Sequence, residues 1–361
     1  VMKLCIIGDG LVSLILAKVL ARKALSVDIF SNSKSIKYSQ TRTIGITKSN
    51  INYLSRNDIN IKKILWEINQ IKIYTENFKK SEILNFSNLN EQVFSIVKNA
   101  EFYDILKKNL IYDKFIKFKK NKDYKKIIKE NYNLVINCDL NNQISKKFFS
   151  KKIKKNYHSL AYTTIINHKK LIKNNIASQI FTNNGPIAFL PISKTQTSVV
   201  YSFKIKQSKN MIDIKKLIHK FNPCYDIVKI GNISNVELKS SNLRNYYKEN
   251  ILAFGDLLHK VHPLAGQGFN MSLRDIICLS KLIDEKLDLG LDLDLTICRD
   301  FEKETRDKNF IFSMGIDWIY EFFYFESKTN NELISKSLSI LGKNKFFNSF
   351  FKKFADSGLR A

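Results

Sequence analysis

The chain has 361 residues, 44% of them hydrophobic, which is enough to bury one large core or two interleaved ones. Its formal net charge is +27, but only 8 of its 60 basic residues are Arg, and the lysines are spread along the whole chain. Nucleic-acid-binding proteins usually cluster their charge and favour Arg, so the composition argues against a nucleic-acid partner. A basic face attracted to anionic lipid is the alternative interpretation of this charge.

The cysteines and the hydropathy of the chain indicate its cellular compartment. Five cysteines are scattered along the chain, and several lie in apolar runs, which favours free thiols in a reducing compartment over disulfides or a metal site. No apolar run is long enough to cross a bilayer, and the N-terminus is typical of a strand entering a glycine turn, not of a signal peptide. We therefore expect a cytoplasmic protein, with peripheral contact to the inner membrane as a further prediction.

The first thirty residues predict a βαβ unit. Residues 3–8 form an apolar run, Gly8 and Gly10 make a turn, and a broad apolar face then continues at helical spacing towards Lys23. A second strand is predicted at residues 26–30. Gly8 and Gly10 occupy the first two glycine positions of the dinucleotide-binding pattern, and Ser13 stands at the third.

Shorter elements follow in the middle of the chain. Strands are predicted at residues 71–74, 83–86 and 93–97, and a helix is predicted at residues 101–110. Residues 114–129 carry many lysines between apolar positions, and we expect a solvated surface stretch there. A buried strand is expected at 134–139, where it ends on Asp139.

The second half is β-rich before it becomes helical. Residues 157–203 contain several predicted strands, and a short amphipathic helix is expected at 215–221. The aromatic residues of 310–325 and the apolar and basic residues of 332–354 suit a helical cap packed on the dinucleotide-binding domain. A surface that meets a membrane is the alternative for this region.

The most informative stretch runs from residue 251 to 282. An apolar strand at 251–254 ends on Gly255, and Asp256 follows where open α/β sheets bind their ligands. Pro263 stiffens the next loop, two glycines follow it, and a helix is expected from Asn270. Arg274 and Asp275 fall outside the apolar stripe of that helix. A helix entered through glycines presents N–H groups and a partial positive charge to an anion or an electron-rich ring.

The motif GD-x-x-H-x-x-HP-x-AGQG-x-N-x-x-x-RD in this stretch resembles the second flavin-contacting motif of the ubiquinone-biosynthesis FAD-dependent hydroxylases, within the flavoprotein aromatic monooxygenase superfamily. Two other segments resemble the same family. These are F-T-x-x-GP-x-A-x-LP, which ends at Pro191, and the aromatic-Glu-x-x-x-Arg signature that starts at Phe301. The resemblance spans nearly the whole chain and is weakest between residues 110 and 150.

The resemblance implies an α/β fold, in which a Rossmann-like FAD-binding domain is interleaved with a β-sheet substrate domain and followed by C-terminal helices. The implied FAD-binding domain has three parts, at residues 1–70, 99–152 and 246–290. The implied substrate domain takes its strands from residues 71–98 and 153–245, and residues 291–361 form the C-terminal helical region.

The resemblance also implies a reaction and a set of cofactor-binding residues. FAD, reduced by NAD(P)H, would react with O2 to give a flavin hydroperoxide that hydroxylates an aromatic ring, here a prenylated quinone precursor. Asp256 would accept hydrogen bonds from the ribityl hydroxyls, and Arg42 would contact the flavin. The expected cofactor-binding residues are Gly8, Gly10, Leu11, Val12, Ser13, Arg42, Asp256, Pro263, Ala265, Gly266, Gln267, Gly268, Phe269 and Asn270.

Departures from the family pattern leave other functions open. The acid that follows the second strand in the family aligns with Ser31, and Leu140 stands where the superfamily has a glycine. A catalytically inactive flavin-fold partner of other quinone-biosynthesis proteins is therefore one alternative, and a reductase or epoxidase of prenyl substrates is another. His259 and His262 could be read as metal ligands, but no third ligand is spaced nearby, so we expect no metal. The sequence names no catalytic acid or base.

Overall fold

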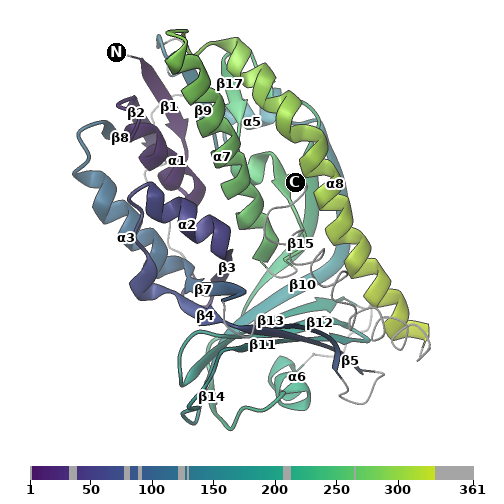
Figure 1. Cartoon of the computed structure of the whole chain (residues 1–361). Helices are drawn as coiled ribbons and strands as arrows, with labels where there is room; N and C mark the ends of the chain where they lie inside the picture. The colour runs from purple at the N-terminus through teal and green to yellow at the C-terminus, as the bar shows by residue number, and fades with distance from the viewer. Residues whose placement is uncertain are drawn as a thin grey trace.

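The protein is described by a computed structural model that covers residues 2–31, 39–76, 82–87, 92–120, 127, 130–205, 213–263 and 266–329. Two sheets of different character dominate it (Figure 1). A largely parallel sheet with helices around it forms one half, and a large, mostly antiparallel sheet forms the other. The predicted α/β fold class is confirmed.

The parallel sheet has six strands in the order β16-β17-β9-β1-β2-β8. Its strands are β1 Lys3–Ile7, β2 Ser26–Ser31, β8 Ile116–Lys120, β9 Leu134–Asn137, β16 Tyr247–Lys248 and β17 Ile251–Ala253. All neighbours pair in parallel except β16, which is antiparallel to β17. The central strands are buried apolar runs, as expected for a parallel sheet covered on both faces.

Helices cover this sheet and complete the larger hydrophobic core. They are α1 Leu11–Ala21, α2 Lys48–Arg56, α3 Asn99–Ile111, α5 Gln143–Phe148 and α7 Gln267–Asp288. Helix α7 contacts α1 and α2 on one side and α8 on the other (Figure 1). The predicted helix after the GD motif thus begins three residues before Asn270, with Gly266 at its N-cap.

The second sheet has nine strands, with the order β18-β15-β10-β13-β12-β11-β5-β6 and with β14 paired to β10. Its strands are β5 Gln70–Thr75, β6 Glu82–Ser87, β10 Lys152–His168, β11 Ile176–Thr182, β12 Gly185–Pro191, β13 Gln196–Lys204, β14 Ile227–Ile230, β15 Ser234–Leu243 and β18 His259–Lys260. Helix α6 Ile214–Phe221 packs Ile214 and Ile218 into an apolar cluster with Phe189 and Tyr201. The opposite face of this sheet is turned towards the parallel sheet (Figure 1).

A small third sheet, of order β3-β7-β4, lies between the two large ones (Figure 1). It consists of β3 Thr43–Thr47, β4 Trp66–Ile68 and β7 Phe94–Lys98, and the 3-10 turn Lys62–Ile64 precedes β4. Strand β3 also contacts the start of α7, so this small sheet connects the two halves of the molecule.

The long helix α8 Leu295–Thr329 runs along one edge of the molecule (Figure 1). Its inner residues Phe312, Ile316, Tyr320 and Phe323 are buried in a cluster with residues of β10, β11 and β15. In the described part of the chain, no helix has both the length and the apolar character needed to span a membrane. Residues 332–354, for which a helical cap was predicted, lie outside the described residues.

Two expectations from the sequence need correction. Residues 114–120 are not simply a solvated stretch, because 116–120 form edge strand β8, with Ile116 buried against β2. Residues 121–126 and 128–129 of the same predicted stretch lie outside the described residues. Arg274 and Asp275 are not outside the buried face of α7, because they are 7% and 0% exposed. Helix α8 packs over these two residues. The apolar period of α7 shows only which of its faces is apolar, so it cannot predict that another helix buries its polar residues.

Candidate active site

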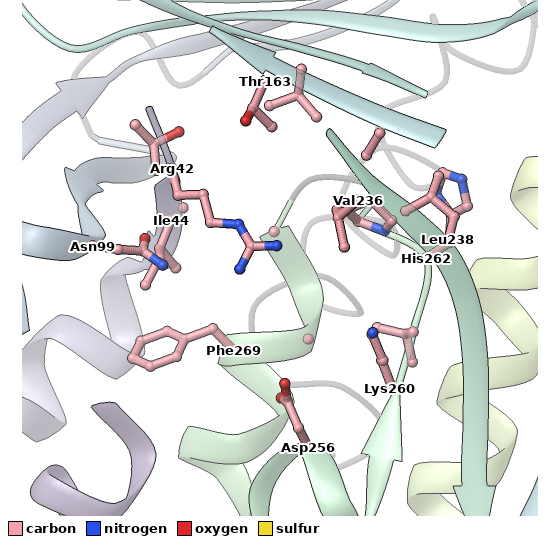
Figure 2. A pocket seen from close by; sticks show the side chains of 18 of the residues that line it. Arg42, Ile44, Asn99, Thr163, Val236, Leu238, Asp256, Lys260, His262 and Phe269 are labelled. Carbon is pink, nitrogen blue, oxygen red and sulfur yellow. The ribbon is translucent and has the colours of Figure 1, made fainter. Parts of the chain in front are cut away.

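A cavity of about 510 Å³ lies where the carboxyl ends of β1, β9 and β17 face the nine-stranded sheet. Figure 2 shows side chains that line it. The residues that follow each of these strands line it, as do residues at the N-termini of α1 and α7. Its volume falls in the range of small-molecule and cofactor sites, at about 300–1,000 Å³. The carboxyl edge of an open α/β sheet is the usual place for such a site.

The turn after β1 brings backbone groups to one side of the cavity. Gly8 has φ +104°, and a Cβ there would lie 3.4 Å from the backbone N of Asp139, so the turn after β1 packs closely on the turn after β9. Gly10 is the N-cap of α1, and no described side chain caps this helix. The first turn of α1 contains no acidic residue, so its positive end is suited to an anionic group.

A buried carboxyl group that the sequence analysis overlooked lies in the same turn. Asp9 is 7% exposed, and its Oδ2 accepts a hydrogen bond of 3.4 Å from the hydroxyl of Tyr103. Burial raises the pKa of Asp9, and the nearby ammonium of Lys107 opposes that rise. Asp9 occupies the variable position between the two pattern glycines, which is why the motif did not single it out.

The loop after β17 supplies a carboxylate. Gly255 has φ +62°, and a Cβ there would lie 3.4 Å from a methyl group of Val12, so this loop packs against the start of α1. Asp256 is exposed, and its carboxylate points into the cavity from below in Figure 2. Lys260 points into the same space from strand β18 (Figure 2). Arg42, at the start of the chain segment leading into β3, extends its guanidinium into the cavity from the other side (Figure 2).

The N-terminus of α7 closes the cavity next to β3. Gly266 adopts φ +66°, and a Cβ there would lie 3.1 Å from the backbone N of Gly45, so a side chain would push these segments apart. No described side chain caps α7, and its first turn is free of acids. Gly268 and Phe269 of this turn line the cavity. The helix therefore directs its partial positive charge at the same space as α1 does.

Asn270 connects α7 to the small sheet. Its Nδ2 donates to the carbonyl oxygen of Gly45 at 2.9 Å, and its Oδ1 accepts from the backbone N of Thr47 at 3.2 Å and from Nδ2 of Asn50 at 2.8 Å. The side chain is 1% exposed and does not line the cavity. The structure thus gives Asn270 a role in holding the α7 N-terminus in place.

Most of the predicted site residues meet at this one cavity. The predicted residues that line it are Gly10, Leu11, Val12, Ser13, Arg42, Asp256, Pro263, Gly266, Gly268 and Phe269. Gly8, Gln267 and Asn270 lie beside it without lining it, and Ala265 is outside the described residues. Two residues of the turn after β9, Cys138 and Leu140, also line the cavity.

The nine-stranded sheet supplies a wall that the sequence analysis did not resolve. Alternate residues of five adjacent strands face the cavity, and most of them are small or aliphatic. These residues are Ala161, Thr163, Ala177, Gln179, Ala188, Leu190, Val200, Ser202, Val236 and Leu238. The period of two along each strand was present in the sequence, but only the pairing register shows which set faces inward.

The two histidines of the GD motif have separate environments. Nε2 of His259 lies 2.5 Å from Oδ2 of Asp275, whose Oδ1 accepts a hydrogen bond of 2.9 Å from Asn309 on α8. The His262 ring instead packs against the rings of Tyr157 and Tyr320, with centroid distances of 4.9 and 4.3 Å. Burial and the nearby Lys155 lower the pKa of His262 to about 3, so it stays neutral at physiological pH. Both histidines therefore hold the loop between the two sheets.

Residues 213–288 match the model of a family described as an FAD binding domain. The matched segment contains β15, the GD loop and α7. This part of the chain is therefore similar to part of an FAD-binding domain. The cavity fits this cofactor, because glycines at the two uncapped helix N-termini keep the approach to the backbone open, and Asp256 offers a hydrogen-bond acceptor.

Curated relatives confirm the resemblance predicted from the motif. The chain is 24% identical over 203 residues to the mitochondrial ubiquinone biosynthesis monooxygenase COQ6 of Xenopus tropicalis, which covers 45% of this chain and 44% of that protein. It is 27% identical over 153 residues to the 3-demethoxyubiquinol 3-hydroxylase of Escherichia coli, covering 39% and 38%. The chain thus spans less than half the length of the curated relatives that it matches.

Solved structures share the whole fold. The p-nitrophenol 4-monooxygenase PnpA of Pseudomonas putida superposes with a TM-score of 0.79 at 11% identity, with 100% of both chains covered. HpxO of Klebsiella pneumoniae, solved in complex with FAD and uric acid, gives a TM-score of 0.74 at 12% identity and covers 100% of this chain and 98% of that one. At these identities the likeness shows the fold alone.

Proposed function

We propose that the chain is an FAD-dependent monooxygenase that hydroxylates an aromatic ring, with a polyprenyl phenol of ubiquinone biosynthesis as its substrate. The observation that carries this proposal is the composition of the single cavity described above. One side presents two helix N-termini and Asp256, and the other presents a largely apolar face of the nine-stranded sheet. A polar cofactor and an apolar substrate could therefore meet in one space.

The polar side has groups that suit each part of FAD. Asp256 would accept hydrogen bonds from the ribityl hydroxyls, and the N-terminus of α1 would lie near the pyrophosphate. The N-terminus of α7, with Gly268 and Phe269, would stabilise negative charge on the reduced ring system, and Arg42 would add a second positive group. The proposed cofactor contacts are thus the predicted residues that line the cavity, with Asn270 acting as their support.

The apolar side suits a ring that carries a prenyl tail. Ala161, Ala177 and Ala188 leave room in the wall, while Val236 and Leu238 exclude water from it. Thr163 and Gln179 offer polar atoms that could orient a phenolic hydroxyl. The wall would orient the substrate and exclude water from it, which is what the protein contributes to a reaction whose chemistry comes from a cofactor.

When bound, FAD would supply the redox chemistry, in which NAD(P)H provides two electrons and O2 provides the oxygen atom. One oxygen atom would replace a ring hydrogen as a hydroxyl group, and the other would leave as water. We also propose that the chain divides into the three-part FAD domain and the two-part substrate domain given above. We further propose a cytoplasmic location with peripheral membrane contact.

A second candidate function rests on Leu140. This residue lines the cavity where the superfamily has a glycine, and its side chain takes space near the turn after β1. A chain that binds FAD without turnover would then serve as an inactive partner of other quinone-biosynthesis proteins. A reductase or epoxidase of prenyl substrates would use the same apolar wall.

The test begins with cofactor binding. Purified protein is expected to be yellow and to hold one FAD per chain noncovalently. Asp256→Ala should weaken FAD binding by about 1.5–3 kcal/mol, or roughly 10- to 150-fold, because a charged acceptor is lost. Glu237→Ala is the matched control, since Glu237 also lines the cavity but is bound to Lys239 at 2.7 Å. Colourless protein that fails to bind micromolar FAD would refute the proposal.

Turnover separates the candidate functions. We expect oxidation of NADH or NADPH that depends on a polyprenyl phenol and yields a product heavier by one oxygen atom, measured by mass spectrometry. Bound FAD with no turnover of prenylated phenols would favour the inactive partner. Reduction or epoxidation of the tail, with the ring unchanged, would favour the third candidate.

A further inference from the structure

Helix α8 has two apolar faces, and among the described residues only one of them is covered. The inner face is buried against the nine-stranded sheet, as described above. The outer face carries five large apolar residues that remain 42–73% exposed. They are Ile311 (55%), Met314 (42%), Trp318 (73%), Phe322 (42%) and Phe325 (61%), and we refer to them as the α8 seam. The outer side of α8 forms the right edge of the molecule in Figure 1.

The spacing of the seam is symmetric about its central residue. Successive members are separated by three, four, four and three residues, so Trp318 has two neighbours on each side at equal distances. A spacing of three and four places all five on one stripe of a helix, as in the apolar seam of a coiled coil. An antiparallel copy of the same helix, related by a two-fold axis at Trp318, would set Ile311 against Phe325 and Met314 against Phe322 of the second copy.

The charges around the seam distinguish a protein face from a lipid surface. Between residues 309 and 325, the only charged residue among the exposed positions of α8 is Glu321, whose carboxylate lies 3.1 Å from Nζ of Lys155. Helices that lie on anionic membranes flank their apolar face with Lys and Arg. The exposed positions of α8 itself carry neither Lys nor Arg within that range, and the nearby Lys155 of β10 is paired with Glu321. A neutral seam also lets two strongly basic copies approach without placing lysines against each other.

The exposed area is sufficient for self-association. With aromatic side chains of about 150–250 Å² each, the exposed parts of the seam sum to roughly 500 Å² per copy, or about 1,000 Å² for a pair. A specific interface needs about 1,000 Å² or more, so a dimer through the seam lies at the lower end of that range. We propose that the α8 seam is the interface of a two-fold homodimer, in which the two α8 helices pair antiparallel across Trp318.

Sedimentation of the full-length holoprotein tests the dimer directly. Wild-type protein should shift from monomer to dimer between ~1 and ~100 µM, the range expected for a small interface. Trp318→Lys should remain a monomer at least tenfold higher in concentration, because it places two like charges at the two-fold axis. Ile172→Lys is the matched control, since Ile172 is 91% exposed but lies outside the seam, and it should dimerise like wild type. A wild-type protein that is monomeric throughout this range would overturn the proposal.

Cysteine cross-linking tests the antiparallel register. In a Cys224→Ser background, which removes the exposed native thiol, Trp318→Cys should form a disulfide-linked dimer by itself. A mixture of Ile311→Cys and Phe325→Cys proteins should also cross-link, whereas each alone should not. Efficient cross-linking of Ile311→Cys with itself would indicate parallel helices and would overturn this geometry.

A membrane role for the seam is the competing outcome. Flotation with vesicles of phosphatidylglycerol and phosphatidylethanolamine should be the same for wild type and Trp318→Lys if the seam pairs with itself. Monomeric protein that floats with these vesicles, and loses flotation in Trp318→Lys, would replace the dimer with a lipid surface. Neither result depends on FAD, because the seam lies on the side of α8 away from the cavity, and flavin absorbance should be equal in both proteins.

Discussion

At the scale of single residues, two buried carboxyl groups in the half of the fold that contains the parallel sheet have pKa values shifted in opposite directions. Asp28, on β2, is 1% exposed and binds Nζ of Lys119 at 2.8 Å and the hydroxyl of Tyr132 at 2.7 Å. Burial alone would raise the pKa of Asp28, but the hydrogen bonds from Lys119 and Tyr132 outweigh it and lower the pKa. The pKa of Asp9 is raised, because burial dominates there.

These directions predict how stability depends on pH. Asp28→Asn should lower the free energy of unfolding at pH 7 by about 1–3 kcal/mol, because charged hydrogen bonds are lost. Because the pKa of Asp28 is lower in the folded than in the unfolded protein, its ionised carboxylate stabilises the fold at pH values above the unfolded-state pKa of about 3.9. This stabilisation is lost as the pH falls towards the folded-state pKa. The gap between Asp28→Asn and wild type should therefore shrink below about pH 4 in urea titrations. Asp9→Asn, the control, should not destabilise at pH 7, and a pH-independent gap for Asp28→Asn would contradict the assignment.

Ser31 provides a second prediction at this scale. It ends β2 opposite Lys120 of β8, where the family pattern has an acid. Ser31→Glu should tighten FAD binding by about 1 kcal/mol, or roughly fivefold, because a carboxylate offers charge-assisted acceptors to the adenosine ribose. Ser26→Glu adds the same charge at the other end of β2 and should leave the affinity unchanged in isothermal titration. Equal or weaker binding by Ser31→Glu would mean that the ribose is held elsewhere.

At the scale of elements, the junction between α7 and β3 determines the shape of the cavity. Asn270 makes hydrogen bonds to Gly45, Thr47 and Asn50, and Gly266 packs directly on Gly45. The N-terminus that α7 presents to the cavity is therefore held in place by buried hydrogen bonds to β3 and α2.

Removing that junction should affect both fold and cofactor. Asn270→Ala is expected to lower the free energy of unfolding by roughly 2–4 kcal/mol, because buried partners at Gly45, Thr47 and Asn50 lose their hydrogen bonds. It should also weaken FAD binding, since the N-terminus of α7 would no longer be held in place. Ser272→Ala is the control, because its hydroxyl makes a single hydrogen bond of 3.4 Å to Gly268 in the same helix. Normal denaturant stability of Asn270→Ala would show that the junction is not needed.

At the scale of the whole molecule, the charge of +27 is the dominant feature. The chain has 60 Lys and Arg against 33 Asp and Glu, and most of the described lysines are exposed, so the folded chain repels itself. Raising the salt concentration from about 20 to about 300 mM should therefore raise Tm by several degrees, because the screening length falls below about 10 Å. Sodium and potassium chloride should act alike, since screening depends on ionic strength. A fall in Tm would mean that favourable ion pairs outweigh the repulsion.

The sequence by itself determined the elements that depend on neighbouring residues. The apolar runs of β1, β9 and β17, the glycine turn before α1 and the loop that carries Asp256 were predicted within one to three residues. Their signals are local, because a buried parallel strand needs an uninterrupted apolar run and a tight turn needs glycine at positive φ.

Only the tertiary structure decided features that depend on distant residues. The strand character of residues 116–120 follows from pairing with β2, and the burial of Arg274 and Asp275 follows from the cover that α8 provides. The pairing register of five strands determines which small residues form the wall of the cavity. A slip of one residue in that register would turn every side chain of a strand to the other face of the sheet. Packing also decides which apolar stripe of α8 is buried and which one, with Trp318 at its centre, is exposed. The sequence cannot decide this, because both stripes have the same helical period.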